Sequence, residues 1–408
     1  MFLAFNLSKN NVKYIGKGKV VIILKNSKKT KYDNRLLFAV IILTLFGYLM
    51  VISAHAVVWI NYGFNQFVFE IGKITVYIII GFILMITIRN RFNLEKAIKY
   101  LQPLSIVVAV MLLGTLVFEE VNGAKAWLRL PGITIQPVEF LKILIILFLA
   151  SHFGKFYGTK AKVSAILRLP LLVLGASFLF VFLAQNDLGS ALILIIISLC
   201  TFLAIPDPKY NKTKFAICFL LLVTVVLFYI FGPALSEYIY GLSNDFPLKS
   251  QLLRIAVLFD PLNDVYNTGY QLTNSLVALV DGGLFGSGPG NSTTKFIVPE
   301  PYNDAILSVI VEELGIFGVL FVFGTYFYII SRLLGYAKLE QIRITDRLIL
   351  IGIASFFMAQ LFVNVGGMVG LIPMTGVTLL FISSGGSSIF AAFIAMGIAL
   401  GVTKRYLK

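Results

Sequence analysis

The feature that most constrains this chain is its series of long apolar segments. A helix needs roughly 20 mostly apolar residues to cross the hydrocarbon core of a bilayer, so these segments predict about ten membrane-spanning helices. The composition agrees, because 58% of the residues are hydrophobic and only 13% are charged, whereas roughly a quarter are charged in soluble domains. We expect the spans at 36–60, 67–88, 100–118, 140–153, 167–185, 188–205, 215–235, 305–331, 347–365 and 377–403. The fourth is short, so we expect it to extend into Glu139 or His152.

Basic residues recur in every second loop, which predicts the orientation of the chain. They gather before residue 36 and again around 89–99, 155–168, 209–214, 332–347 and 404–408. Loops rich in Lys and Arg stay on the cytoplasmic side, so both termini are expected there. This predicts a basic cytoplasmic tail (1–35), a transmembrane domain (36–403) and a short cytoplasmic tail (404–408) in a multi-pass membrane protein. The net charge of +15 then reflects the orientation of the chain in the membrane, and we expect no nucleic-acid partner.

Polar residues are concentrated in the loops on the opposite side, mainly in one large extracytoplasmic loop that we expect at 236–304. Connections of this length are uncommon unless they are functional. The loop contains the glycine-rich run DGGLFGSGPGNS and ends in VPEPYND, which brings Asp304 to the start of an apolar helix. An Asp there is either an N-cap, which accepts hydrogen bonds from free backbone N–H groups, or a catalytic group. The local sequence leaves both interpretations open.

Several ionisable residues lie inside or beside the predicted spans, where an unpaired charge is costly. Glu312 and Glu313 are adjacent, so they point about 100° apart and must both find partners. Glu139 and Lys142 are three residues apart, so they share one helix face and can pair. Such groups either pair inside the bundle or line a polar cavity. The same two interpretations apply to Asp187, as a cap or a cavity wall, and Asn364 adds a polar group to the ninth span.

The order of several motifs resembles a known family. The motifs are GAKAW, QPVEFLK, NDLGSALIL, FDPLNDVYNTGYQLTNSLVAL, GGLFGSGPGNSTTK, PEPYND followed by EELG, and NVGGMVGLIPMTG followed by FISSGGSS. Together they resemble the SEDS proteins, the FtsW and RodA peptidoglycan polymerases of the bacterial cell membrane. The resemblance covers about residues 36–403. The motif GPGNSTTK leans towards FtsW, and therefore towards a role in division rather than elongation.

The resemblance implies inverting glycosyl transfer on lipid II, a disaccharide-peptide carried on a polyprenyl diphosphate. Asp304 would be the catalytic base that removes a proton from the acceptor's 4-hydroxyl group. Cationic groups would stabilise the departing diphosphate, and Arg254, Lys295 and Lys142 are the candidates. The other substrate-binding or cavity-lining candidates are Trp127, Gln136, Glu139, Asp187, Gln271, Glu300, Glu312, Glu313, Asn364, Ser387 and Ser388.

The resemblance also implies partners and leaves the cofactor open. A class B penicillin-binding protein would supply transpeptidation, beside other divisome or elongasome membrane proteins. A divalent cation such as Mg²⁺ is compatible with diphosphate chemistry, but no metal-ligand spacing is present and the chain has only two histidines. The identity of any metal therefore stays unknown at this point.

The chain departs from the family pattern at several positions. It has Ala126 before Trp127 where Arg is common, Val138 where Ser is usual, and Tyr-Asn-Asp-Ala-Ile-Leu at 302–307 where His-Thr-Asp-Phe-Ile-Phe is usual. Two other functions therefore stay open beside the polymerase. One is a flippase or transporter for a lipid-linked precursor, which would depend on mid-membrane charges. The other is a non-catalytic scaffold for a division transpeptidase.

Overall fold

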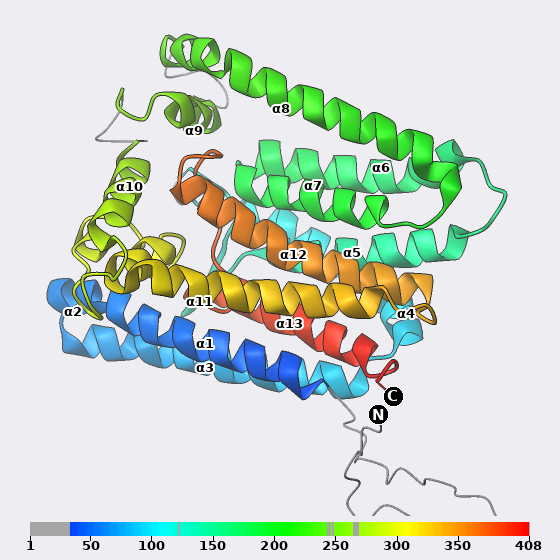
Figure 1. Cartoon of the computed structure of the whole chain (residues 1–408), viewed down its shortest axis with the longest axis horizontal. Coiled ribbons are helices and arrows are strands. Elements are labelled where there is room, and N and C mark those ends of the chain that lie inside the picture. The colour runs from blue at the N-terminus through cyan, green and yellow to red at the C-terminus, as the bar shows by residue number, and fades with distance from the viewer. Residues whose placement is uncertain (1–32, 121–122, 243–245, 247–248, 264–268, 408) are drawn as a thin grey trace, which may run out of the picture.

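The computed structural model describes residues 33–120, 123–242, 246, 249–263 and 269–407, so the basic tail before residue 33 lies outside the described residues. The elements form a bundle of long helices with one small hairpin (Figure 1). The helices up to the middle of the chain are α1 Asn34–Ala54, α2 Ala56–Tyr62, α3 Phe64–Arg91, α4 Leu94–Thr115, α5 Pro137–Phe156, α6 Val163–Leu179 and α7 Leu188–Leu203. The remaining helices are α8 Asn211–Tyr240, α9 Lys249–Phe259, α10 Tyr270–Gly282, α11 Ile306–Ala337, α12 Ile344–Met368 and α13 Gly386–Thr403. Short helical turns cover Phe180–Ala184, a π-helix, and Pro208–Tyr210 and Thr294–Phe296, both 3₁₀-helices.

The predicted series of membrane spans is confirmed, with one helix shorter than expected. Nine segments of the described chain are long and apolar enough to cross a membrane, and α7, with 16 residues, supplies a shorter apolar helix. The fourth span does extend at both ends, because α5 includes Glu139 and His152. The start of α1 and the end of α13 lie at the same end of the bundle, as do the connections that carry the basic clusters (Figure 1). Which side of the membrane this end faces stays a prediction.

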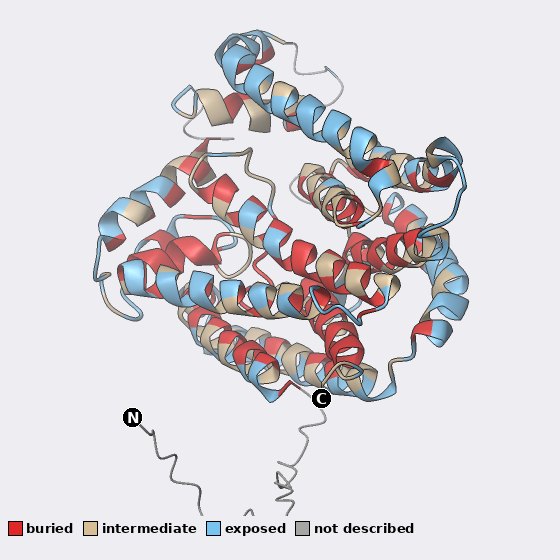
Figure 2. Cartoon of the chain, turned by 45° about the vertical axis from the view of Figure 1, so that its right-hand side comes forward, coloured by how far each residue is buried: buried red, intermediate tan, exposed pale blue. Residues whose placement is uncertain are grey.

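The core lies around α12 and α13, and Figure 2 shows that the exposed residues are concentrated on the outer helices of the bundle. In their apolar windows, 72% of α12 and 83% of α13 is buried, against 6% of the segment that contains α8. An apolar helix with no buried face is stable in a bilayer because its backbone hydrogen bonds are internal and lipid covers its side chains. We therefore expect lipid to cover the exposed apolar surface of α8.

The prediction of a helix over 377–403 is wrong in its first part. Residues 377–385 are not helical, although most of them are buried, and α13 begins only at Gly386. Non-helical backbone is tolerated at membrane depth where protein encloses it. Here α1 encloses it closely, because a Cβ atom on Gly47 would lie only 2.4 Å from the Cα atom of Ile382.

The segment between α4 and α5 and the large loop at 236–304 contain secondary structure that the sequence did not predict. The predicted all-α domain contains one antiparallel hairpin, in which β1 (Leu128–Leu130) pairs with β2 (Ile133–Ile135), within the loop at 119–139. The loop at 236–304 contains the helices α9 and α10. Segments 243–245, 247–248 and 264–268 of that loop lie outside the described residues.

Helix α11 is broken at Gly315, and the break receives the glycine-rich loop. Gly315 has a φ of 59°, in the left-handed region, and a Cβ atom there would lie 2.5 Å from the backbone oxygen of Leu284. The loop continues along the first part of α11, where Ser287 N donates to Glu312 O at 2.8 Å and Gly288 N donates to Glu313 O at 3.0 Å. These backbone bonds dock the glycine-rich run on α11.

Substitution of Gly315 tests whether this close approach stabilises the bundle. We expect Gly315→Ala to lower the free energy of unfolding by about 2 kcal/mol or more, because a left-handed conformation costs about 1–2 kcal/mol for a residue with a Cβ atom and the new methyl group meets backbone. Thermal unfolding of the purified protein in detergent measures the effect. Gly324→Ala is the matched control in the same helix, because a Cβ atom there meets nothing within 4 Å. Equal melting temperatures for the two variants would contradict the assigned role.

Candidate functional site

The turn before α11 carries Asp304, and its backbone is fixed by α12. The predicted N-cap role is wrong, because α11 begins at Ile306 and the preceding residue is Ala305. Instead, Asn364 Nδ2 donates to Asp304 O at 2.7 Å and to Val377 O at 2.7 Å. One amide group thus holds together the turn with Asp304 and the non-helical segment after α12.

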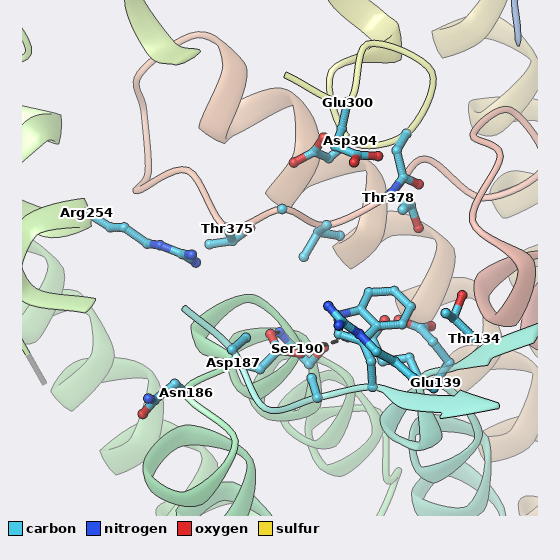
Figure 3. Close-up of a pocket in the computed structure, with 18 residues that line it drawn as sticks. Thr134, Glu139, Asn186, Asp187, Ser190, Arg254, Glu300, Asp304, Thr375 and Thr378 are labelled. Carbon is cyan, nitrogen blue, oxygen red and sulfur yellow. Dashed lines mark hydrogen bonds between the residues drawn. The ribbon is translucent and has the colours of Figure 1, made fainter. Parts of the chain in front are cut away.

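A polar cavity of about 270 Å³ opens beside Asp304. Figure 3 shows Glu300 and Asp304 on one wall, Asn186, Asp187 and Ser190 on the opposite wall, and Arg254 pointing in from α9. The lining residues come from segments far apart in the chain: the hairpin and its flanks, the starts of α5 and α7, helix α9, the turn before α11 and residues 375–378. Of the candidates from the sequence, the cavity brings together Trp127, Gln136, Glu139, Asp187, Arg254, Glu300 and Asp304.

The carboxyl group of Asp304 is held in an environment that favours its protonated form. Burial raises the pKa of Asp304 to about 6, the hydrogen bond from Gln271 opposes the rise, and the charge of Glu300 adds to it. Gln271 Nε2 donates to Asp304 Oδ2 at 3.4 Å, which places this candidate beside the carboxyl group. Asp304 Oδ1 is buried and has no hydrogen-bond partner among the described residues. A carboxyl group with a pKa near neutrality and a free oxygen atom is suited to proton transfer.

Asp187 both caps α7 and forms part of the cavity wall. Its Oδ1 accepts from Ser190 N at 2.9 Å, which caps the helix, and its Oδ2 accepts from Gln136 Nε2 at 2.9 Å. The backbone N–H of Gln136 in turn donates to Ser387 Oγ at 2.8 Å, which ties α5 to the start of α13. Ser388 donates to Gly385 O at 2.8 Å within that start. Both serines therefore support the walls of the cavity rather than line it.

Glu139 and Lys142 form an ion pair at the base of the cavity. Lys142 Nζ lies 2.7 Å from Glu139 Oε1, and the lysine side chain is fully buried. Glu139 lines the cavity, and its Oε2 has no partner among the described residues. Lys142 is not among the lining residues, so it neutralises Glu139 rather than reaching a ligand.

Lys295, Glu312 and Glu313 lie away from this cavity and fasten the glycine-rich loop to α11. Glu312 accepts hydrogen bonds from Ser292 Oγ at 2.5 Å, from Thr293 N and Oγ1 at 2.7 Å each, and from Thr294 N at 3.0 Å. Lys295 Nζ lies 3.3 Å from Glu313 Oε1, and both side chains are buried. Ser53 Oγ donates to the same oxygen at 2.5 Å. The predicted cavity-lining role of the two glutamates and the predicted diphosphate contact of Lys295 do not fit these positions.

Several lining residues were not predicted from the sequence, above all Arg129. Arg129 is on β1 and pairs across the hairpin with Thr134, which lines the same cavity. Arg129 and Arg254 are the basic side chains that line the cavity in the described part of the chain. The hairpin alternation could have placed Arg129 and Thr134 on one face, but only a prediction of the hairpin would have supplied that signal.

The cavity's carboxylates do not form a metal site among the described residues. No group of three or more His, Cys, Asp or Glu side chains there could hold a metal ion. Mg²⁺ bound by substrate phosphates needs only one or two protein carboxylates, so a divalent cation stays a prediction and no chemical step is assigned to it here.

Comparison with known proteins identifies the family. The FtsW/RodA/SpoVE family, described as "Cell cycle protein", matches residues 34–407. The chain belongs to this family. A Bacillus subtilis protein named "Probable peptidoglycan glycosyltransferase FtsW" is 33% identical over 393 residues, which cover 93% of this chain and 92% of that protein.

Two solved structures share the fold of this FtsW/RodA/SpoVE member. A chain of a peptidoglycan synthase complex, reported for its coordination of polymerization and crosslinking, superposes with a TM-score of 0.70 at 24% identity and covers 92% of this chain and 98% of that chain. The Rod shape determining protein RodA of Thermus thermophilus superposes with a TM-score of 0.60 at 25% identity and covers 92% and 97%, respectively. The predicted polytopic SEDS fold is therefore confirmed.

The bonds to Glu312 predict that this residue stabilises the loop before Asp304. We expect Glu312→Ala to lower the free energy of unfolding by about 3 kcal/mol, because buried donors left without a partner cost about 1–3 kcal/mol each. Thermal unfolding in detergent and the rate of proteolysis within residues 288–296 measure the stability and the release of the loop. The exposed Glu340, in the loop between α11 and α12, provides the control Glu340→Ala. Wild-type stability of Glu312→Ala would contradict the role as a fastening residue.

Proposed function

We propose that this protein is a peptidoglycan glycosyltransferase that joins the disaccharide units of lipid II into glycan strands. The observation that carries the proposal is the carboxyl group of Asp304, with its raised pKa and unpartnered oxygen, in a polar cavity that also receives two arginines. Family membership supports the reaction type, since relatives that cover more than 90% of this chain are named for it.

In the proposed reaction, Asp304 acts as the general base. Its carboxylate takes the proton of the acceptor's 4-hydroxyl group as that oxygen attacks the anomeric carbon of the donor. The new glycosidic bond forms on the face opposite the leaving group, so the configuration inverts. The bond from the anomeric carbon to the polyprenyl diphosphate breaks, and the diphosphate leaves with the electron pair. Arg254 and Arg129 stabilise its charge, and Asn364 keeps Asp304 in position.

The pairing of the intramembrane charges favours the enzyme over a flippase. Glu139 pairs with Lys142, and Glu313 pairs with Lys295, in buried ion pairs. A translocation path would need polar groups that face a continuous watery passage, whereas Lys142 pairs with Glu139 within α5 and Lys295 pairs the glycine-rich loop with Glu313 of α11.

We propose that the cavity faces the outside of the cell membrane and that both termini are cytoplasmic. The described basic clusters support this orientation, because the connections that carry them lie at the end of the bundle opposite the start of α11 (Figure 1). A class B penicillin-binding protein is the proposed partner, which the similarity to a chain of a complex that combines polymerization with crosslinking supports. The FtsW names of the relatives favour a role in division.

The first test measures glycan formation from purified lipid II, with and without the partner transpeptidase. We expect polymer from the wild-type protein and from Asp281→Asn, which changes an exposed carboxylate in the same loop, and at least a 1000-fold lower rate from Asp304→Asn. The asparagine retains the shape of the side chain but cannot accept the proton. Polymer from a well-folded Asp304→Asn at the wild-type rate would remove the assigned base. Absence of polymer from every variant, with the partner and Mg²⁺ present, would contradict the polymerase function.

The raised pKa of Asp304 predicts the pH dependence of the reaction. The base must be ionised, so kcat/KM is expected to fall about tenfold per pH unit below about 6 and to level off above about 7. The charge of Glu300 contributes to the rise, so Glu300→Gln is expected to move the inflection to lower pH. The measurement is the initial rate of polymerisation between pH 4.5 and 8.5. An inflection near pH 4 in the wild-type protein would contradict the assigned environment of Asp304.

A further inference from the structure

A second polar cavity, of about 370 Å³, adjoins the cavity beside Asp304. We call it the α3 cavity, because Gln66, Glu70, Lys73 and Tyr77 of α3 line one of its walls. Trp127, Thr134, Glu300 and Asn303 line both cavities, so the two spaces meet at these four side chains. The proposed reaction at Asp304 uses only the cavity beside that residue and leaves the α3 cavity without a role.

The lining of the α3 cavity fits a carbohydrate. Tyr62, Tyr77 and Tyr302 join Trp127 around it and offer aromatic faces with polar edges. Asn303 Oδ1 is buried without a hydrogen-bond partner among the described residues, so an acceptor atom is available where the two cavities meet.

Two adjacent glycines keep this space open. A Cβ atom on Gly385 would lie 3.2 Å from Asn303 Oδ1 and 2.6 Å from Ser388 Oγ, and a Cβ atom on Gly386 would lie 2.8 Å from the ring of Tyr77. Any side chain at these positions would therefore reduce the volume beside Asn303 and Tyr77.

Lys73 supplies a cation at the wall of the α3 cavity. Its Nζ lies 2.5 Å from Glu70 Oε2, and the two side chains are 33% and 24% exposed, respectively. An ion pair with this much exposure is screened by solvent and contributes little to stability. A diphosphate, with more negative charge and more acceptor oxygens than one carboxylate, can therefore compete with Glu70 for the ammonium group.

We infer that the α3 cavity binds the acceptor substrate, a lipid-linked disaccharide diphosphate, with its diphosphate at Lys73 and its terminal sugar directed past Asn303 towards Asp304. The inference rests on the proposed function, which requires two lipid-linked saccharides at once. Ligand cavities for a single small molecule have about 300–1000 Å³, so the 270 Å³ beside Asp304 does not hold both. The donor belongs there, because Arg129 and Arg254 line that cavity and not the α3 cavity.

The test separates the two substrates chemically. A lipid-linked disaccharide whose terminal 4-hydroxyl group is blocked can only donate, and one whose anomeric oxygen is replaced by a methylene group can only accept. The wild-type protein couples one of each into a single product, and the KM of each substrate is measured with the other at saturation. The variants are Lys73→Met, Glu70→Gln and Arg254→Met, with Lys99→Met, an exposed lysine near the start of α4, as the control.

We expect Lys73→Met to raise the KM of the acceptor at least tenfold and to change the KM of the donor less than twofold. Glu70→Gln breaks the same ion pair but frees the cation, so it is expected to lower the KM of the acceptor. A merely structural ion pair would instead give the same change in both variants. Arg254→Met is expected to raise the KM of the donor or lower kcat, and Lys99→Met is expected to match the wild-type protein.

The outcomes distinguish this inference from the proposed function. In one case, the wild-type protein couples the two substrates while Lys73→Met leaves the acceptor KM unchanged, or while Lys73→Met and Glu70→Gln change it equally. Either result would overturn the α3 cavity as the acceptor site and leave the polymerase function intact. An increase in the donor KM alone in Lys73→Met would reverse the assignment of the two cavities and overturn the inference as stated. No coupling by the wild-type protein would contradict the proposed function itself.

Discussion

The site depends on one side chain, the amide of Asn364, which must satisfy two backbone carbonyl groups. The turn that ends at Asp304 and the segment around Val377 are both non-helical, so their carbonyl groups have no partner in a helix. An unsatisfied backbone group at membrane depth costs several kcal/mol. Asn364 is on the core helix α12 and donates to both carbonyl groups. A buried core helix thus fixes the backbone of Asp304, while the carboxyl group of Asp304 stays available to the cavity.

The acidic residues of this region serve two different physical purposes. Glu312 and Glu313 are satisfied by several donors, and they hold the glycine-rich loop against α11 and α1. Asp304, only eight residues before Glu312, has a weak hydrogen bond to one oxygen and none to the other among the described residues. A carboxylate surrounded by donors is stabilised as a charge, whereas a buried carboxyl group with few donors keeps a raised pKa. The same residue type therefore fastens the loop at one position and is suited to accept a proton at the other.

The sequence predicted those parts of the structure that depend on local composition. Hydrophobic length located the spans, and proline and glycine patterns located the turn before α11. The same criteria failed for residues 377–385, because an apolar segment has the same composition whether lipid or protein covers it. The close packing of Ile382 on Gly47 shows that protein covers this segment. Candidates that sit in named motifs, such as Asp304, Gln136 and Asp187, line one cavity. Lys295 was misplaced because its side chain is directed by an ion pair with Glu313 of α11. Arg129 was missed because its direction depends on the hairpin, which was not predicted.

The arrangement of the two cavities also bears on how the reaction keeps its direction. Both substrates of the proposed reaction carry the same lipid, diphosphate and sugars, so shape alone cannot tell donor from acceptor. The difference must come from where positive charge is strong enough to stabilise a leaving group. The cavity beside Asp304 receives two arginines, whereas the charge of Lys73 is partly cancelled by Glu70. A diphosphate at Lys73 is therefore held but weakly activated, and a diphosphate beside Arg129 and Arg254 is stabilised as it departs. The proposed base lies in the same cavity as the arginines. Asp304 therefore takes the proton from the acceptor's hydroxyl group beside the donor carbon that loses the diphosphate.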